Sequence, residues 1–111
     1  MTFSLLVRDP SDGRIGVASA TAGPAVGAFV PRAEARVGAV ATQGFSTNPF
    51  WTREGLAALA EGGAPEAVAA RLSAADPGRR RRQLAILSAD GRGAAWSGDD
   101  NDPWRGHRIA T

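Results

Sequence analysis

The sequence predicts one small domain of the α+β class, with its elements in the order ββ-β-αα-ββ. Short runs of alternating apolar residues occur near both ends of the chain, and a strong turn signal interrupts each end region, which is typical of antiparallel hairpins. Between them lie two segments with helix start and stop signals and apolar residues on one helical face. The length of 111 residues suffices for one domain and not for two.

The first hairpin is predicted over residues 3–20. Apolar residues alternate in 3–7, as in a half-buried strand. Residues 9–13 read Asp-Pro-Ser-Asp-Gly, a dense turn signal. Residues 14–20 then form the returning strand, and its many small residues leave room for a close approach to the backbone.

A third strand is predicted over residues 37–43. It is apolar almost throughout, so we expect it to be a central strand, and Gly44 ends it. The preceding segment, 21–31, is rich in Gly, Ala and Pro and is predicted to be a connecting loop.

Two helices follow this strand. Asn48 supplies a capping side chain and Pro49 suits the first helical position, while Gly62 and its glycine neighbour stop the first helix. Pro65 opens the second helix, which ends before Asp76. Apolar residues on one face of each helix predict packing against a sheet.

A second hairpin is predicted after the helices. Its strands cover 83–89 and 93–97, and Asp90 and Gly91 form the turn between them. The last segment, 98–111, has no periodic pattern and is predicted to be irregular.

The composition excludes several classes of protein. The chain has no Cys, which removes disulfides, thiolate metal sites and cysteine nucleophiles. It also has no Lys, so all 13 basic residues are Arg, and the formal net charge is only +2. No apolar run is long enough to cross a membrane, and no secretory signal is recognisable, so we expect a cytoplasmic protein with no membrane partner.

The residue after the initiator methionine is the strongest candidate for a catalytic residue. If Met1 is removed, Thr2 carries a hydroxyl nucleophile and a free α-amine on one residue at the start of a strand. Such an amine has a pKa of about 7.7–8.0 and can act as a base near neutral pH. The alternative is that Thr2 is simply the second residue of the chain.

His107 is the only histidine and could be a general base or a metal ligand. Asp99, Asp100 and Asp102 precede it, but their spacing matches no metal-ligand template, so no metal or other cofactor is predicted. The favoured interpretation of these aspartates is a solvated loop.

Four consecutive arginines, 79–82, suggest phosphate or nucleic-acid contacts. No aromatic stacking platform flanks this run, so a solvated entry into the next strand is favoured, and nucleic acid is not the expected partner. Asp76 or Glu66 is predicted to pair with one of the arginines.

Three aromatic residues, Phe45, Phe50 and Trp51, surround the start of the first predicted helix. We expect them to anchor the core. The alternative is that they form the wall of a substrate pocket beside Gly44.

Several segments together resemble Domain of Unknown Function family 1028. They are TFSLLVRDP-SDGRIGVASAT, VPRAEARVGAVATQG, RRQLAILSADGRGAAWSG and WRGH. The resemblance implies an Ntn-hydrolase-like fold, a four-layer αββα sandwich. The family domain continues past its WRGH-like element into a glycine-rich stretch and a QGN-type motif that are absent here. Residues 1–111 are therefore expected to be the N-terminal portion of a single, incomplete Ntn-hydrolase-like domain.

The resemblance implies hydrolysis of an amide bond in a small amide or peptide, with Thr2 as nucleophile. Gln43 and Gly44, in the turn after the third strand, are the expected place for oxyanion donors, and His107 lies in a segment that matches a family element. Proteasome-like relatives place a Lys near the nucleophile, and this chain has none. An Arg in the comparable region, Arg32 or Arg36, cannot shuttle protons.

Two other classes of function stay open beside the hydrolase. One is a non-catalytic binding or structural protein that retains the fold. The other is nucleic-acid binding through the arginine run, which the sequence supports less well. For each of these functions, assembly into a homo-oligomer stays possible.

Overall fold

The computed structural model describes residues 1–110 and confirms the α+β class, with two antiparallel sheets and three α-helices. In chain order the elements are β1 (Thr2–Arg8), β2 (Ile15–Thr21), α1 (Val26–Phe29), β3 (Pro31–Glu34), β4 (Gly38–Gln43), α2 (Phe50–Ala60), α3 (Pro65–Ala75), a 3₁₀ turn η1 (Arg79–Arg81), β5 (Gln83–Ser88) and β6 (Gly93–Ser97).

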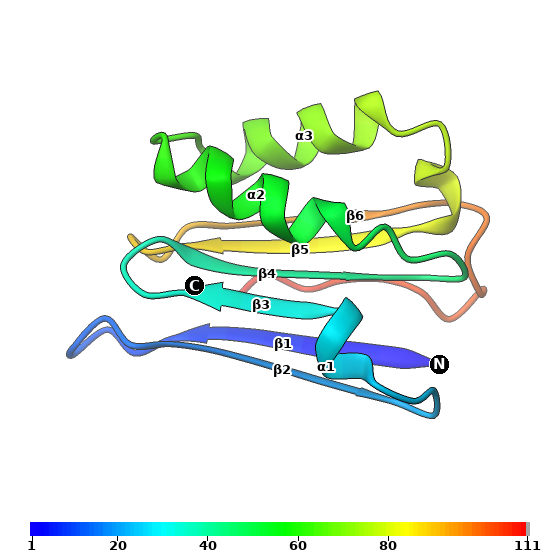
Figure 1. The fold of residues 1–111 in the computed structure, drawn as a ribbon, viewed down its shortest axis with the longest axis horizontal. Coiled ribbons are helices and arrows are strands. Elements are labelled where there is room, and N and C mark those ends of the chain that lie inside the picture. Colours follow the sequence, from blue (N-terminus) through cyan, green and yellow to red (C-terminus); the bar gives the residue numbers. More distant parts are fainter. Residues whose placement is uncertain (111) are drawn as a thin grey trace.

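The elements form three layers (Figure 1). The middle layer is a four-stranded sheet in the order β3-β4-β5-β6. Helices α2 and α3 cover one of its faces, and the β1–β2 hairpin lies over the other face as a separate two-stranded sheet. The start of β1 and the end of β4 lie at the same end of the molecule, which brings two distant parts of the sequence together.

Most predicted elements are confirmed. The strand at 37–43 corresponds to β4 and is central, because it pairs with β3 on one side and β5 on the other. The predicted loop over 21–31 is wrong in part, because it contains α1 and the start of β3. Both elements have only four residues, too few to show a helix or strand period in the sequence.

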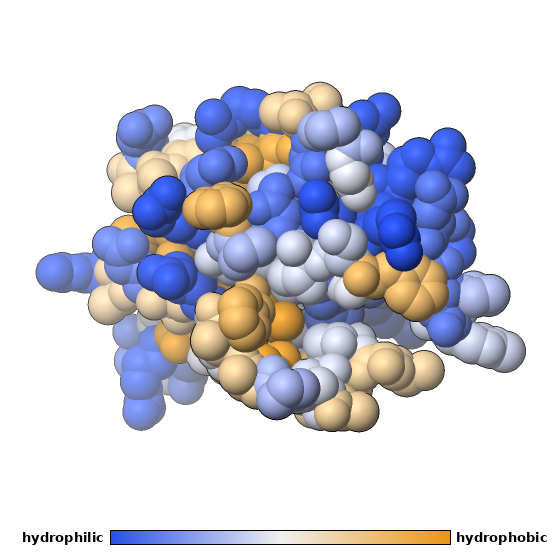
Figure 2. All heavy atoms as spheres, turned by 45° about the vertical axis from the view of Figure 1, so that its right-hand side comes forward, coloured by the Kyte–Doolittle hydropathy of each residue, from blue (hydrophilic) through white to orange (hydrophobic). Residues whose placement is uncertain are grey.

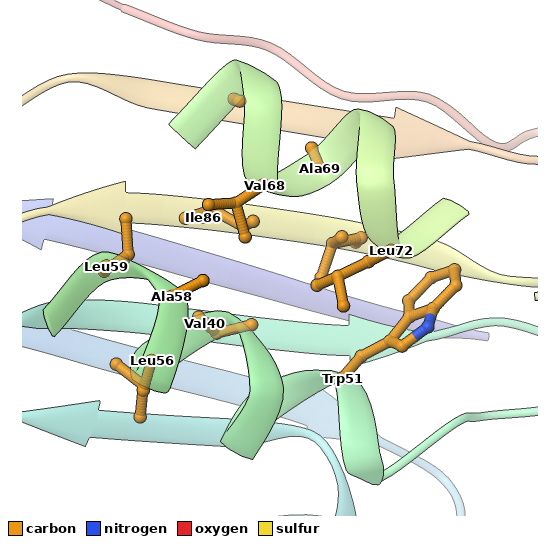
Figure 3. Packing of buried hydrophobic residues seen from close by; sticks show 11 residues of the cluster. Val40, Trp51, Leu56, Ala58, Leu59, Val68, Ala69, Leu72 and Ile86 are labelled. Carbon is orange, nitrogen blue, oxygen red and sulfur yellow. The ribbon is translucent and has the colours of Figure 1, made fainter. Parts of the chain in front are cut away.

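The core lies between the two long helices and the middle sheet (Figure 3). Trp51 and Leu56 of α2 and Leu72 of α3 point toward the sheet, where Val40 and Ile86 meet them. All five side chains are buried, and burial of such side chains contributes roughly 1.5–3 kcal/mol each. These contacts fix the position of β4, and therefore of the turn that follows it.

The predicted helix boundaries hold, with one shift at the start of α2. The side chain of Asn48 accepts a hydrogen bond from the backbone N–H of Phe50 at 3.2 Å, so it caps the helix from just outside the first turn. Gly62 follows α2 with a φ of +87°, the left-handed conformation that ends many helices. Pro65 is the first residue of α3, where its missing N–H costs nothing.

One buried hydroxyl in the middle sheet is unsatisfied. Thr42 of β4 is fully buried, and its Oγ1 has no hydrogen-bond partner among residues 1–110. A buried polar group without a partner lowers the stability of a fold.

Thr42→Val is therefore expected to raise the free energy of unfolding by about 1 kcal/mol, because it replaces the unpaired hydroxyl by a methyl group of similar size. Urea unfolding monitored by tryptophan fluorescence measures this as a higher midpoint at an unchanged slope. A lower midpoint would mean that the hydroxyl has a partner after all.

The outer face of the hairpin is apolar. Phe3, Leu5 and Val7 alternate along β1 and point away from the middle sheet, with 68%, 61% and 49% of their surfaces exposed. Patches of hydrophobic residues lie in the lower half of the space-filling view, over the hairpin layer (Figure 2). The inward face of β1 carries Thr2 and Ser4, so this strand turns its polar residues toward the middle sheet.

The arginine run forms the turn η1 and the residue after it, not a strand. Arg82 pairs with Asp76 at 2.7 Å, which confirms one of the two predicted acidic partners. Arg80 pairs with Asp100 at 2.9 Å, and Arg81 lies 5.8 Å from the ring centre of Phe45. The run therefore connects three separate parts of the chain.

None of the helices within residues 1–110 has the length and apolar character needed to cross a membrane.

Candidate functional site

Three residues predicted from the sequence line one small cavity. Thr2, Gln43 and Gly44 border a space of about 130 Å³ at the end of β4. Trp104 and Arg105 from the irregular C-terminal segment also line this cavity. The cavity thus lies between the start of the chain, the turn after the central strand and the last described segment.

The hydroxyl of Thr2 is held by a neighbouring hydroxyl. Thr2 and Thr21 are direct cross-strand partners in the hairpin, and their Oγ1 atoms lie 2.8 Å apart. Thr21 Oγ1 donates its own proton to the carbonyl oxygen of Met1 at 3.2 Å. Thr2 is the donor between the two hydroxyls whenever Thr21 donates to Met1.

The side chain of Gln43 is fully occupied by protein partners. Its Nε2 donates to the backbone carbonyl of Thr2 at 2.9 Å and to Gln83 Oε1 at 3.2 Å. Its Oε1 accepts a hydrogen bond from Ser4 at 2.8 Å. In this arrangement the amide positions Thr2, and any oxyanion donor must come from the backbone of the turn.

Gly44 is required at its position for steric reasons. Its φ is +127°, and a Cβ atom there would lie only 2.4 Å from the carbonyl oxygen of Arg81. The next residue, Phe45, donates its backbone N–H to Asn101 Oδ1 at 3.1 Å, which fixes the turn from the C-terminal segment. The glycine thus has a structural role as the end of the strand, and a catalytic role of its backbone stays a prediction.

His107 contacts Ser97 and is linked to Thr2 through other side chains. Its Nδ1 lies 3.0 Å from Ser97 Oγ, and Ser97 in turn accepts a hydrogen bond from Gln83 at 3.0 Å. Gln83 then contacts Gln43, which holds the carbonyl of Thr2. The histidine ring is exposed, at the far end of this series of contacts.

The aspartates before His107 serve other partners. Asp99 pairs with Arg105 at 3.4 Å, and Asp100 pairs with Arg80. Within residues 1–110 no three His, Asp or Glu side chains lie close enough together to hold a metal ion.

The three aromatic residues near the start of α2 differ in burial. Trp51 is buried in the core, as expected, but Phe45 and Phe50 have 61% and 60% of their surfaces exposed, so their assignment to the core is wrong. Phe45 follows Gly44 and lines the cavity, in agreement with the alternative interpretation for this residue.

Besides Asn101, which lines the cavity and holds the turn at Phe45, four polar residues near the cavity were missed from the sequence: Ser4, Thr21, Gln83 and Ser97. Two of them could have been found, because the register of the first hairpin places Thr2 opposite Thr21 and Ser4 opposite Ser19. The other two lie on β5 and β6, and only the three-dimensional arrangement brings them beneath the N-terminus.

A larger groove of about 740 Å³ lies between α3 and β6. Alanines dominate its lining, and its polar residues are Glu66, Ser73 and Arg79. None of the predicted site residues borders this groove, and it lacks paired reactive groups, so the smaller cavity is the better candidate for chemistry.

The fold and the site describe an α+β domain with a hydroxyl residue near its N-terminus beside a small cavity. The chain belongs to DUF1028, a family of unknown function whose sequence profile matches residues 2–111. It is also similar to the crystal structure of protein SPO2555 from Silicibacter pomeroyi, assigned to DUF1028, with a TM-score of 0.90 and 39% sequence identity. The similarity covers 93% of this chain and 48% of that one, so this chain spans about half the length of that protein. The comparison with curated proteins found no match.

Proposed function

We propose that this chain carries the nucleophile of an N-terminal-nucleophile hydrolase, which cleaves an amide bond with Thr2 after removal of Met1. One observation carries the proposal: Thr2 and Gly44, from the start of β1 and the end of β4, border the same cavity. An αββα architecture of the Ntn-hydrolase type is part of the proposal. Its support is a helical layer, two stacked sheets and a first strand, β1, whose polar side chains face the middle sheet.

The reaction follows from the groups around Thr2. Its Oγ attacks the substrate carbonyl carbon, and its proton passes to the free α-amine, which acts as general base. The negative charge on the carbonyl oxygen is stabilised by the backbone N–H of Gly44, since those of the next two residues already donate to Asn101 and Arg81. When the amide C–N bond breaks, the leaving amine takes up this proton, and water then hydrolyses the Thr2 ester.

The hydroxyl of Thr21 lies beside the nucleophile, where proteasome-like hydrolases have a Lys that this chain lacks. It lies 2.8 Å from the Thr2 hydroxyl and 3.2 Å from the carbonyl oxygen of Met1. The carbonyl carbon of Met1 is bonded to the nitrogen that becomes the free amine. Once Met1 has left, Thr21 therefore stands near both the nucleophile and its base, where it can orient the proton between them.

The cavity limits the substrate class. With Met1 still part of its lining, the cavity of about 130 Å³ accommodates a small acyl group, and loss of Met1 opens it further on the side of Thr2. Phe45 and Trp104 provide aromatic surface at its border, while Gln43 and Gln83 provide uncharged polar surface. The expected substrate is a small amide or the end of a peptide.

The state of the N-terminus tests the proposal directly. We expect intact-mass measurement of the purified chain to show the loss of Met1. We also expect periodate to cleave the Cα–Cβ bond of Thr2, because an amine and a hydroxyl then lie free on adjacent carbons. A chain that retains Met1 and resists periodate would contradict the proposal.

A non-catalytic binding protein is the second candidate, and one observation favours it. Both N–H groups of the Gln43 amide donate to protein partners, Thr2 and Gln83, so this side chain has no donor left for an oxyanion. A chain with a free Thr2 that hydrolyses no amide but binds small amides would support this candidate.

A further inference from the structure

Side-chain hydrogen bonds connect the N-terminal strand with the C-terminal segment. The carbonyl of Thr2 accepts from Gln43 Nε2 at 2.9 Å, and the same nitrogen donates to Gln83 Oε1 at 3.2 Å. Gln83 Nε2 then donates to Ser97 Oγ at 3.0 Å and to the carbonyl oxygen of Gly106 at 3.2 Å. Each glutamine amide thus uses both of its N–H groups, and each amide oxygen accepts from another side chain: that of Gln43 from Ser4, and that of Gln83 from Gln43.

The surroundings of Ser97 favour one tautomer of His107. Ser97 Oγ accepts a proton from Gln83, and among the described residues His107 Nδ1, at 3.0 Å, is the acceptor within reach of its own hydroxyl proton. An imidazole that accepts at Nδ1 carries its proton on Nε2. We therefore expect the neutral histidine to favour this tautomer.

We propose that Gln83 is a positioning residue for the Thr2 site. Its amide oxygen meets the side chain that holds the Thr2 carbonyl, and its amide nitrogen holds the carbonyl of Gly106. Gly106 directly follows Arg105, which lines the same cavity as Thr2. Gln83 consequently sets the distance between the nucleophile and the far wall of the cavity.

The catalytic meaning of this role rests on the proposed hydrolase function, whereas the hydrogen bonds can be tested without any reaction. A purely space-filling role predicts that any side chain of similar size at position 83 preserves the site. The positioning role predicts that the loss of the amide changes both His107 and Thr2.

The test uses the full chain and two readouts. The first is the set of imidazole nitrogen chemical shifts of neutral His107 by NMR, which needs no assignment because the chain has one histidine. The second is the rate at which a small β-lactone acylates Thr2, measured by mass spectrometry. In that reaction the lactone C–O bond breaks as the Thr2 ester forms, and the hydroxyl proton passes to the released alkoxide.

In the unchanged chain we expect one tautomer, with the proton on Nε2. Gln83→Leu should give shifts averaged between the two tautomers, as in a free imidazole, and acylation slower by about tenfold to a hundredfold. In Gln83→Glu the carboxylate attracts the Ser97 proton, so His107 must donate from Nδ1 and the roles of its two nitrogens reverse.

Two further variants separate this role from a loss of stability. Leu87→Ala lies on the same strand and face as Gln83 but outside the hydrogen-bonded series, and it should change neither readout. Ser97→Ala releases His107 while the bond between Gln43 and Gln83 remains, so it should alter the shifts but slow acylation less than Gln83→Leu does.

Unchanged histidine shifts in folded Gln83→Leu and Gln83→Glu would overturn the positioning role. If Thr2 acylation persists in that case, the hydrolase proposal survives without it. If instead no variant or unchanged chain is acylated while the shifts behave as expected, the hydrolase proposal fails and the positioning of His107 by Gln83 stands.

Discussion

Thr2→Ala is expected to abolish amide hydrolysis by the mature chain, with a loss on the order of 10³-fold or more. Alanine keeps the free α-amine but has no hydroxyl to attack a carbonyl. A panel of amino-acid anilides and small primary amides, followed by release of the amine, measures the effect. Because Met1 is removed most readily before a small residue, the variant should expose its new N-terminus as Thr2 does.

Thr2→Ser is the matched control for this experiment. Serine keeps the hydroxyl and the amine on one residue and loses only the methyl group, so it should retain measurable hydrolysis. A Thr21→Val variant should hydrolyse amides at a rate between those of Thr2→Ala and Thr2→Ser, because it removes the hydroxyl 2.8 Å from Thr2 Oγ1 but leaves the nucleophile. Equal rates in Thr2→Ala and the unchanged chain would show that another group performs the reaction.

The sequence predicts the elements whose signals are local. The two hairpins form around turns rich in Asp, Pro and Gly, and β4 follows from a nearly continuous apolar run. The short elements between residues 21 and 34 escape prediction for a physical reason. Helix α1 buries no residue, and β3 is an edge strand with one partner, so neither needs an apolar face.

Only part of the candidate site can be predicted from the sequence. Thr2 and Gly44 can be proposed because each has a special chemical or steric property at a strand end. Gln83 and Ser97 have no such property, and their role comes from the pairing of β4, β5 and β6 across the middle sheet. His107 lies in a segment without periodicity, so the contact it makes with Ser97 depends on folding of the whole chain.

The exposed aromatic side chains illustrate a further limit. Apolar residues are more often buried than exposed, but a folded protein still shows much apolar surface, so the type of residue alone does not decide burial. Trp51 lies within the first turn of α2 and faces the sheet, whereas Phe50, one position earlier, faces solvent. Successive residues of a helix point in different directions, so Trp51 is buried although its neighbour Phe50 is exposed.

Asp76→Asn is expected to lower the free energy of unfolding by about 3 kcal/mol at neutral pH. Asp76 and Arg82 form an ion pair with side chains only 7% and 15% exposed, and removal of the negative charge leaves the guanidinium without a counterion in a largely desolvated position. Asn48 also donates to the carboxylate at 2.7 Å, so the substitution disturbs the start of α2 as well. Urea unfolding at neutral pH measures the effect.

The pH dependence provides an independent check on this ion pair. Burial raises the pKa of Asp76, but hydrogen bonds from Asn48, Arg82 and the backbone of Gly78 outweigh it and lower the pKa below its usual value. A lowered pKa in the folded state means that the carboxylate stabilises the protein above the unfolded-state pKa of about 3.9. This stabilisation is lost as the pH falls through the folded-state pKa, so the difference between the unchanged chain and Asp76→Asn should shrink on acidification below about pH 4.

Asp100→Asn is the matched control, because it removes the partner of another arginine in the same run. That pair is 64% and 49% exposed, so solvent screens it and its loss should lower the stability much less than Asp76→Asn does. If both substitutions had equally small effects, the buried pair would not stabilise the connection between the turn η1 and the start of α2. The two pairs join an arginine to an aspartate at similar distances of 2.7–2.9 Å, so the expected difference comes from the burial of Asp76 and from its further hydrogen bonds to Asn48 and Gly78.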